Sequence, residues 1–282
     1  MKVNLFIVGA PKAGTTSLYN YLSQHVDVLM SSEKEPDFFS RAELHNQDIY
    51  YIKSRISTEK KYHDLFNHYK NEKILGEASV SYLYYPEVPK KIIKYNPNSK
   101  IIIMLRNPSE RAYSHYLMDF RLGLNNKSFL EVFDEKNSLF FQQYFKLGRY
   151  YDQVKRYIKI FGRNNIHVIW HHEFTKNTQE EVFKVFDFLN IKRLKIDSKT
   201  KHNKYFLPRN IYIKKFYSLY FFRKLLKLFI HKQLIKIIKN FLFLDGKKPQ
   251  LDDITKKKID KYFSNDIEKL EDLLLKKLDR WK

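Results

Sequence analysis

The chain has 282 residues, with 53 lysines and arginines against 31 aspartates and glutamates, and no cysteine. Its length suits one α/β domain, and the lack of cysteine excludes a disulfide framework, a thiolate metal site and a cysteine nucleophile. The formal net charge of +22 predicts anionic partners, which include nucleic acid, anionic lipid and an acidic substrate or cofactor.

The first element is a short apolar run at residues 3–8, which predicts a buried strand. A glycine-bearing loop follows, and residues 18–22 have the apolar spacing of a helix. The first turn of a helix presents unpaired N–H groups, so this arrangement favours an anion. A lysine adds charge and hydroxyls can donate to the same oxygens. The predicted phosphate site consists of Pro11, Lys12, Ala13, Gly14, Thr15, Thr16 and Ser17.

This loop differs from the common nucleotide pattern G-x-x-x-x-G-K-[ST]. Gly9 and Gly14 keep the glycine spacing, but Thr15 stands where that pattern has lysine. The lysine here is Lys12, inside the loop, from where it reaches a different part of a ligand. The usual Mg²⁺ geometry is therefore not implied, and an ordinary βα turn is the alternative interpretation.

The second candidate stretch is residues 32–40, where Pro36 predicts a loop or a strand end. Its carboxylates stand beside Phe38 and Phe39, and a carboxylate in a partly dry site gains basicity. The alternative is a solvated charged loop anchored by two buried phenylalanines. Spacing alone favours that alternative.

Strands and helices alternate through the middle of the chain. We expect short helices over residues 41–72, a strand at 74–79, a helix opened by Pro86, a buried strand at 100–105, a helix at 139–160, a strand at 166–170 and a helix at 178–189. His171, His172 and Glu173 suggest a metal, but neighbours on an extended chain point to opposite faces. No metal is therefore expected.

Arg106 follows the strand at 100–105, and Asn107 before Pro108 is typical of a helix N-cap. Arg106 would then lie at the carboxyl end of a strand, where ligands bind in open α/β sheets. Ser114 comes two helical turns later. The sequence thus predicts an anion contact at Arg106, with a structural salt bridge as the alternative.

Residues 211–244 are apolar, aromatic and strongly basic at helical spacing. They fit a surface helix against an anionic membrane, or a basic amphipathic helical insertion packed on the domain, which we favour. After residues 247–249 two closing helices are expected. No linker is apparent, so residues 1–282 are predicted to form a single domain.

Three stretches in this order resemble the sulfotransferases that use 3′-phosphoadenosine 5′-phosphosulfate (PAPS), especially the Golgi heparan-sulfate type and its bacterial relatives. Residues 9–18 are similar to the family's 5′-phosphosulfate loop, which also carries its lysine inside the loop. Residues 33–39 are similar to E-x-E-x-H-F-F, and residues 103–114 to the 3′-phosphate segment L-R-[DN]-P-x-E-R-x-x-S. The resemblance implies a P-loop-type central parallel β-sheet flanked by helices, with a helical C-terminal region.

The resemblance also implies roles for the matched positions. Lys12 would hold the transferring sulfuryl group and Glu35 would be the general base. The implied cofactor contacts are Gly14, Thr15 and Thr16 for the 5′-phosphate, and Arg106 and Ser114 for the 3′-phosphate. Residues 202–209 with Lys247 and Lys248 would replace a cysteine-stapled loop of the heparan-sulfate enzymes.

Three positions depart from the heparan-sulfate pattern: Asp37 for histidine, Ser40 for aspartate and Ala78 for lysine. The predicted acceptor is therefore another saccharide or a glycolipid, sulfated at a hydroxyl or an amine without a metal. The alternatives are a P-loop kinase-like phosphotransferase and a non-enzymatic binder of polyanions or membrane surfaces. No specific nucleic acid is expected, and the sequence leaves the oligomeric state undetermined.

The first strand begins within a few residues of Met1, so we expect no secretory signal. No window of eighteen apolar residues predicts a transmembrane segment. These features predict a cytoplasmic protein, with peripheral contact at the inner face of the membrane as a further hypothesis for residues 211–244.

Overall fold

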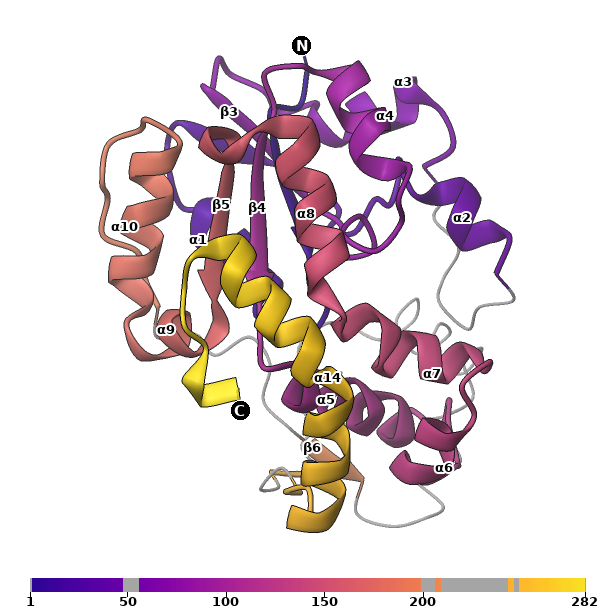
Figure 1. Ribbon diagram of the computed structural model, residues 1–282. Helices are drawn as coiled ribbons and strands as arrows, with labels where there is room; N and C mark the ends of the chain where they lie inside the picture. Colours follow the sequence, from indigo (N-terminus) through magenta and orange to yellow (C-terminus); the bar gives the residue numbers. More distant parts are fainter. Residues whose placement is uncertain (1, 48–55, 199–205, 209–242, 246–248, 282) are drawn as a thin grey trace.

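The computed structural model describes residues 2–47, 56–198, 206–208, 243–245 and 249–281 (Figure 1). Its central sheet contains five parallel strands in the order β2-β3-β1-β4-β5 within these residues. The strands are β1 Leu5–Gly9, β2 Val28–Met30, β3 Ile74–Ala78, β4 Lys100–Leu105 and β5 Ile166–Trp170. The predicted α/β fold with a parallel sheet is confirmed.

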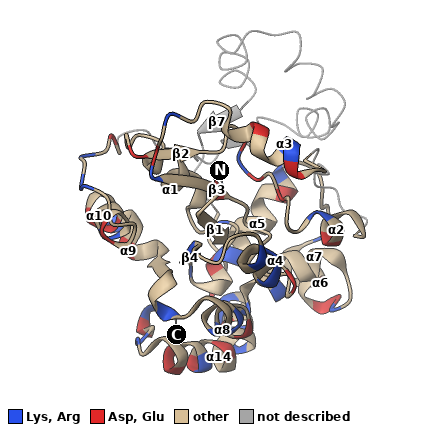
Figure 2. Cartoon of the chain, turned by 90° about the horizontal axis from the view of Figure 1, so that it is seen from above, with Lys and Arg blue, Asp and Glu red and all other residues tan. Residues whose placement is uncertain are grey.

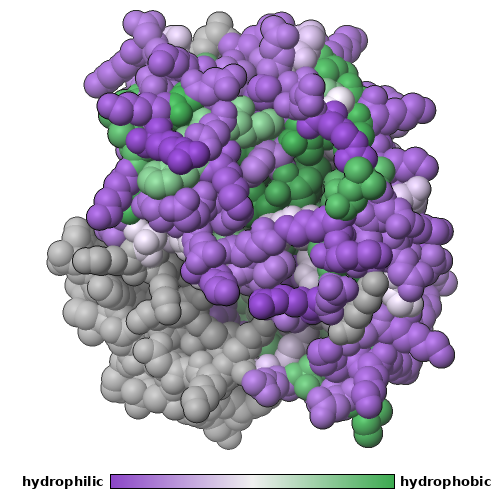
Figure 3. All heavy atoms as spheres, turned by 60° about the vertical axis from the view of Figure 1, so that its left-hand side comes forward, coloured by the Kyte–Doolittle hydropathy of each residue, from purple (hydrophilic) through white to green (hydrophobic). Residues whose placement is uncertain are grey.

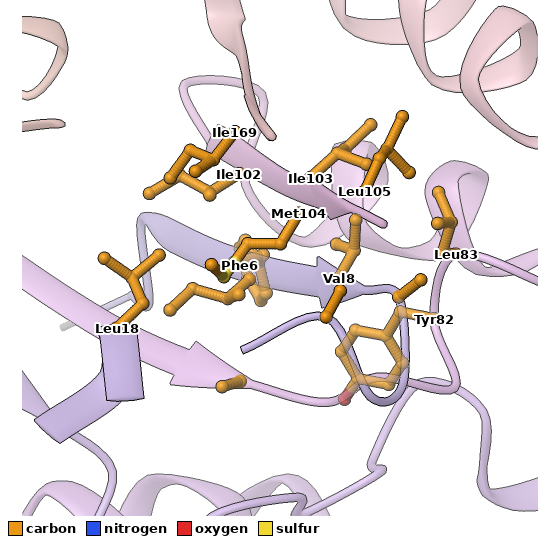
Figure 4. Close-up of a cluster of buried hydrophobic side chains, with 14 of the residues drawn as sticks. Phe6, Val8, Leu18, Tyr82, Leu83, Ile102, Ile103, Met104, Leu105 and Ile169 are labelled. Atoms are coloured by element: carbon orange, nitrogen blue, oxygen red, sulfur yellow. The ribbon is translucent and has the colours of Figure 1, made fainter. Parts of the chain in front are cut away.

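The core lies around β1 and β4, which pair in the middle of the sheet. Every residue of β1 is buried, and β4 is buried from Ile101 to Leu105. Strands covered on both faces are near-continuous hydrophobic runs, as these two are. Figure 4 shows Phe6 and Val8 of β1 beside Ile102 and Met104 of β4. This core fixes the carboxyl ends of both strands, from which two of the predicted site segments start.

Helices cover both faces of the sheet (Figure 1). One face packs against α1 (Thr15–Leu22), α9 (His171–Lys176) and α10 (Thr178–Phe188). On the other side α8 (Tyr150–Phe161) packs against β5, and α4 (Val88–Tyr95) and α14 (Asp253–Leu274) pack against α8. Beyond the carboxyl end of β4 lie α5 (Pro108–Arg121), α6 (Phe129–Asp134) and α7 (Leu139–Tyr144). Two short helices, α2 (Arg41–His45) and α3 (Glu59–His63), separate β2 from β3 in the chain.

The helix predicted over residues 139–160 is wrong as a single element. It is divided into α7, a 3₁₀ turn at Lys146–Gly148 and α8, which begins at Tyr150. The carboxylate of Asp266, on α14, accepts hydrogen bonds from the N–H groups of Tyr150 and Tyr151 at 2.6 and 3.2 Å. A cap supplied by a distant helix starts α8 there, and sequence spacing does not reveal it.

The helical structure predicted for residues 211–244 is wrong at its C-terminal end. A strand β7 at Phe243–Asp245 pairs antiparallel with β6 at Phe206–Pro208. Residues 211–242, and the predicted site residues Lys247 and Lys248, lie outside the described residues. The first of the two predicted closing helices is the long helix α14. In place of the second there is a single 3₁₀ turn at Asp279–Trp281.

Figure 2 shows many charged residues along α8, α10 and α14, which lie around the sheet. The face beside α10 is mostly hydrophilic, with hydrophobic residues gathered in a hollow near its middle (Figure 3). In the part of the chain that the structure describes, no helix is long and apolar enough to cross a bilayer.

Candidate functional site

The loop after β1 leads directly into the N-terminus of α1. Gly14 is the N-cap residue, with φ of 98°, a conformation that favours glycine. No described side chain caps the helix. The Ser17 N–H donates to the carbonyl of Gly14 at 3.0 Å, and the first turn of α1 receives no hydrogen bond from a described side-chain cap.

Lys12 lies in this loop with φ of 67°, partly buried. Among the described residues, its Nζ has one hydrogen-bond contact, the Sδ atom of Met118 at 3.4 Å. Burial is the main cause that lowers the pKa of Lys12 to about 8. The charges that act on it, in order of size, come from Arg121, Asp119, Arg106 and Glu35. Arg106 and Glu35, which the resemblance places in the same site, are thus both close enough to Lys12 for their charges to act on it.

Arg106 stands between β4 and α5, and the predicted cap is confirmed. The Asn107 side chain accepts from the N–H of Glu110 at 3.1 Å. Arg106 donates through Nε and Nη2 to Oε2 of Glu110 at 3.1 and 2.9 Å, and through Nη1 to the carbonyl of Lys12 at 3.4 Å. The salt bridge offered as an alternative is therefore present, and the same guanidinium contacts the loop after β1. Ser114 lies further along α5, partly buried.

Glu35 lies in the loop that follows β2. Its side chain is 45% exposed and pairs with Lys34. Its N–H donates to the carbonyl of Ala78, at the end of β3, at 2.9 Å. Glu35 and Asp37 have φ of 60° and 50°, in the left-handed region that residues other than glycine rarely adopt. The loop is thus held against β3 in an unusual conformation.

Asp37 is the carboxylate most affected by burial in this loop. Its Oδ1 accepts from the Ser81 hydroxyl at 2.6 Å, and Ser81 Oγ is 2.8 Å from Ser40 Oγ. Burial raises the pKa of Asp37 to about 7, the Ser81 bond opposes this, and the charges of Glu35 and Glu77 add to it. The prediction of a partly dry carboxylate therefore fits Asp37 better than Glu35.

We expect Asp37→Asn to stabilise the chain increasingly as the pH rises from about 4 to about 7. Because the folded pKa is raised from 3.8 to about 7, the folded state keeps a proton that the unfolded state loses. In the native chain, the stability that protonated Asp37 contributes is complete below the unfolded pKa and is lost as the pH rises through the folded pKa, whereas asparagine does not titrate. The asparagine oxygen can still accept from Ser81. Relative to the native chain, the free energy of unfolding of Asp37→Asn should rise over this pH range by at most about 4 kcal/mol.

Urea unfolding of both proteins at about pH 4, 5.5 and 7 measures this difference. Glu33→Gln, at an exposed position of the same loop, is the control and should show no comparable trend. A difference between native and Asp37→Asn that is the same at every pH would contradict the raised pKa.

Glu77, in β3, is fully buried, and sequence reasoning did not assign it a role. Its Oε1 accepts from the hydroxyls of Tyr62 and Tyr82 at 2.7 and 3.0 Å, and its Oε2 from Ser79 Oγ at 2.7 Å. Burial raises its pKa to about 7, and the three hydroxyl bonds act in the opposite direction. The glutamate followed by the hydroxyl-bearing residues Ser79 and Tyr82 was a sequence signal for these hydrogen bonds. Tyr62 is too distant in the sequence to be recognised as the third partner of Glu77.

Three residues of α5 near Lys12 were also missed: Met118, Asp119 and Arg121. Ser114, Met118 and Arg121 are spaced i, i+4 and i+7, so they share one helix face. That spacing was a usable signal once Ser114 had been selected.

His171, which the sequence placed on an extended segment, begins α9 instead. The described residues contain no group of three side chains suited to a metal ion.

Comparisons with known proteins agree on one family. A family model described as "Sulfotransferase domain" matches residues 2–273. A crystal structure of a sulfotransferase from Alicyclobacillus acidocaldarius has a TM-score of 0.74 and 27% identity, and the match covers 100% of this chain and 99% of that one.

Two curated relatives match over shorter regions. "Membrane-associated sulfotransferase kil1" of Dictyostelium discoideum is 30% identical over 125 residues, which is 44% of this chain and 25% of the relative. Human "Carbohydrate sulfotransferase 15" is 25% identical over 247 residues, which is 67% of this chain and 44% of the relative. The match therefore spans less than half the length of either relative.

Proposed function

The chain belongs to the sulfotransferase domain family, and on that premise we propose that it transfers the sulfuryl group of PAPS to a hydroxyl or amine of a saccharide or glycolipid. The observation that carries this proposal is that Lys12 is approached by the other two predicted residues: Arg106 donates to its carbonyl, and the charges of Arg106 and Glu35 act on its ammonium. These residues come from three loops that are far apart in the sequence. They are also the residues on which the sequence resemblance depends.

The loop after β1 fits a phosphate group. Lys12 is a partly buried cation whose Nζ contacts, among the described residues, the thioether of Met118, and α1 has no described side-chain cap. An anion would satisfy both the ammonium and the N–H groups of the first turn. Arg106 and Ser114 fit a second phosphate, because Arg106 can exchange Glu110 for a phosphate without losing its contact with the loop.

When bound, PAPS supplies the sulfuryl group and a leaving phosphate. The residues then have separate tasks, since group transfer of this kind depends mainly on positioning and charge stabilisation. Glu35, which is exposed and can reach an acceptor, takes the proton of the attacking hydroxyl or amine. Lys12 places its ammonium against the charge that develops on the leaving phosphate. No metal takes part in this proposal.

The acceptor side of the loop is acidic and hydroxyl-bearing, with Glu35, Asp37, Ser40 and Ser81. Ala78 is buried and supplies no charge there. This favours a neutral or amine-bearing acceptor over heparan sulfate. We further propose that residues 1–282 form one cytoplasmic domain; vesicle sedimentation would test the further hypothesis that residues 211–244 contact an anionic membrane.

Calorimetric titration with 3′-phosphoadenosine 5′-phosphate (PAP), and with 5′-AMP as control, tests the cofactor. Binding that requires the 3′-phosphate is the expected result. Transfer of ³⁵S from PAPS to glucosamine- and galactosamine-containing oligosaccharides then tests the acceptor class. Equal binding of PAP and 5′-AMP, or Mg²⁺-dependent ATP turnover, would overturn the proposal.

Arg106→Ala is expected to weaken PAP binding by roughly 10- to 100-fold, because a charge-assisted bond to phosphate contributes about 1.5–3 kcal/mol. Binding of 5′-AMP, which lacks the 3′-phosphate, should change little. Calorimetry with both ligands measures the effect. Glu110→Gln is the matched control, because it removes the ion-pair partner of Arg106 and keeps the guanidinium. Equal weakening in both variants would mean that Arg106 acts only through its salt bridge.

A further inference from the structure

We propose that Glu77, through the hydroxyls of Ser79 and Tyr82, positions the loop that carries Glu35. The importance of Glu35 rests on the proposed function, whereas the attachment of its loop rests on the contacts alone. Glu77 is a positioning residue in this proposal, since it is fully buried and contacts the loop only through other groups.

The loop is attached by alternate N–H groups. Those of Glu35, Asp37 and Phe39 donate to the carbonyl of Ala78, to Ser79 Oγ and to the Tyr82 hydroxyl, at 2.9, 3.0 and 3.2 Å. Two of these three acceptors are hydroxyl groups. A hydroxyl accepts well only when its own hydrogen is directed elsewhere.

Glu77 provides that direction. The hydrogens of Ser79 and Tyr82 both point to its carboxylate, which leaves their lone pairs free for the N–H groups of Asp37 and Phe39. The single carboxylate therefore sets the orientation of both hydroxyls. Because it is buried, no water competes for this task.

The loop needs such attachment because of its backbone. Glu35 and Asp37 both have positive φ, which their side chains disfavour, and such conformations persist only where the surroundings impose them. The ring of Phe39 anchors the far end of the loop, packed edge-on against Phe6 and Tyr82 with centroid distances of 5.9 and 5.8 Å. Between these anchors, the N–H bonds fix where the Glu35 carboxylate points.

Tyr62 offers a matched control. It also donates to Oε1 of Glu77, at 2.7 Å, and its ring stacks on Phe38 with a centroid distance of 4.6 Å. In the described residues, no N–H of residues 35–39 donates to its hydroxyl. Tyr62→Phe and Tyr82→Phe thus each remove one bond to Glu77, but only Tyr82→Phe removes an attachment of the loop.

Hydrogen exchange of the peptide covering residues 33–40, followed by mass spectrometry, is the primary test. Tyr82→Phe and Ser79→Ala should each speed exchange in this peptide by about 3- to 10-fold, the range that one net hydrogen bond gives. Tyr62→Phe should leave it near the native rate. Glu77→Gln should behave like the first two variants, because its amide nitrogen cannot accept from Ser79.

The second readout separates positioning from stability. With an acceptor oligosaccharide that the native chain sulfates, Tyr82→Phe should lower the turnover number by roughly 10- to 100-fold, while PAP binding stays within about twofold of native. Tyr62→Phe should change neither. Equal exchange and equal turnover in the two tyrosine variants would overturn the proposal. If the native chain sulfates nothing, the proposed function fails, and the exchange pattern still decides whether Glu77 holds the loop.

Discussion

Replacing Glu35 by glutamine is expected to lower the turnover number by about 10²- to 10⁴-fold, the usual contribution of a general base. Glutamine is nearly the same size but cannot take a proton from the acceptor. PAP affinity should stay within about twofold of native, because the charge that Glu35 places on Lys12 is the smallest of those acting on it. Initial rates of ³⁵S transfer and calorimetry with PAP measure the two quantities.

Glu33→Gln is the matched control, since Glu33 is an exposed carboxylate of the same loop. It should leave both turnover and binding unchanged. Asp37 is the competing candidate, because burial raises its pKa to about 7, near the value that suits a base. Should Asp37→Asn abolish turnover while Glu35→Gln keeps it, the base would have to be reassigned to Asp37.

The second large effect concerns Lys12, whose charge should depend on the ligand. Since its pKa is lowered to about 8, the free chain loses this positive charge as the pH rises above that value. A bound phosphate favours the charged form and raises the pKa again. PAP affinity should therefore fall by up to about tenfold per pH unit above about pH 8, and binding at pH 9 should take up close to one proton.

Calorimetry at pH 9 in two buffers with different ionisation enthalpies counts the protons. The phosphates of PAP do not disturb the count, because their second pKa, about 6, is far below this pH. Lys12→Arg keeps its charge and should bind without proton uptake. Lys12→Met should also lose proton uptake, together with about 10²- to 10³-fold in turnover. Proton uptake that persists in Lys12→Met would assign it to another group.

The parts of the site that the sequence predicted are those with local causes. The strands at 100–105 and 166–170 have the predicted bounds, because a short, mostly apolar run needs no distant partner to be recognised. Asn107 caps α5 as predicted, since a cap depends only on residues three positions away. The glycine spacing around Lys12 is local in the same way.

The parts that were missed depend on distant contacts. The burial of Glu77 requires Tyr62, which lies on a different element, and the environment of Lys12 requires that α5 be packed under the loop. The start of α8 is set by Asp266 of α14, more than a hundred residues later. In each case the deciding partner is chosen by tertiary packing, which overrides local pattern.

The position of β1 between β3 and β4 has a consequence for synthesis on the ribosome. The strand that is translated first of the five has partners at residues 74–78 and 100–105, so one of its edges stays unpaired until β3 has been made and the other until β4 has been made. Such edges invite wrong pairings and attract chaperones. Folding of the nascent chain can therefore be completed only after β4 has emerged, and the loop that carries Lys12 cannot take its final place before then.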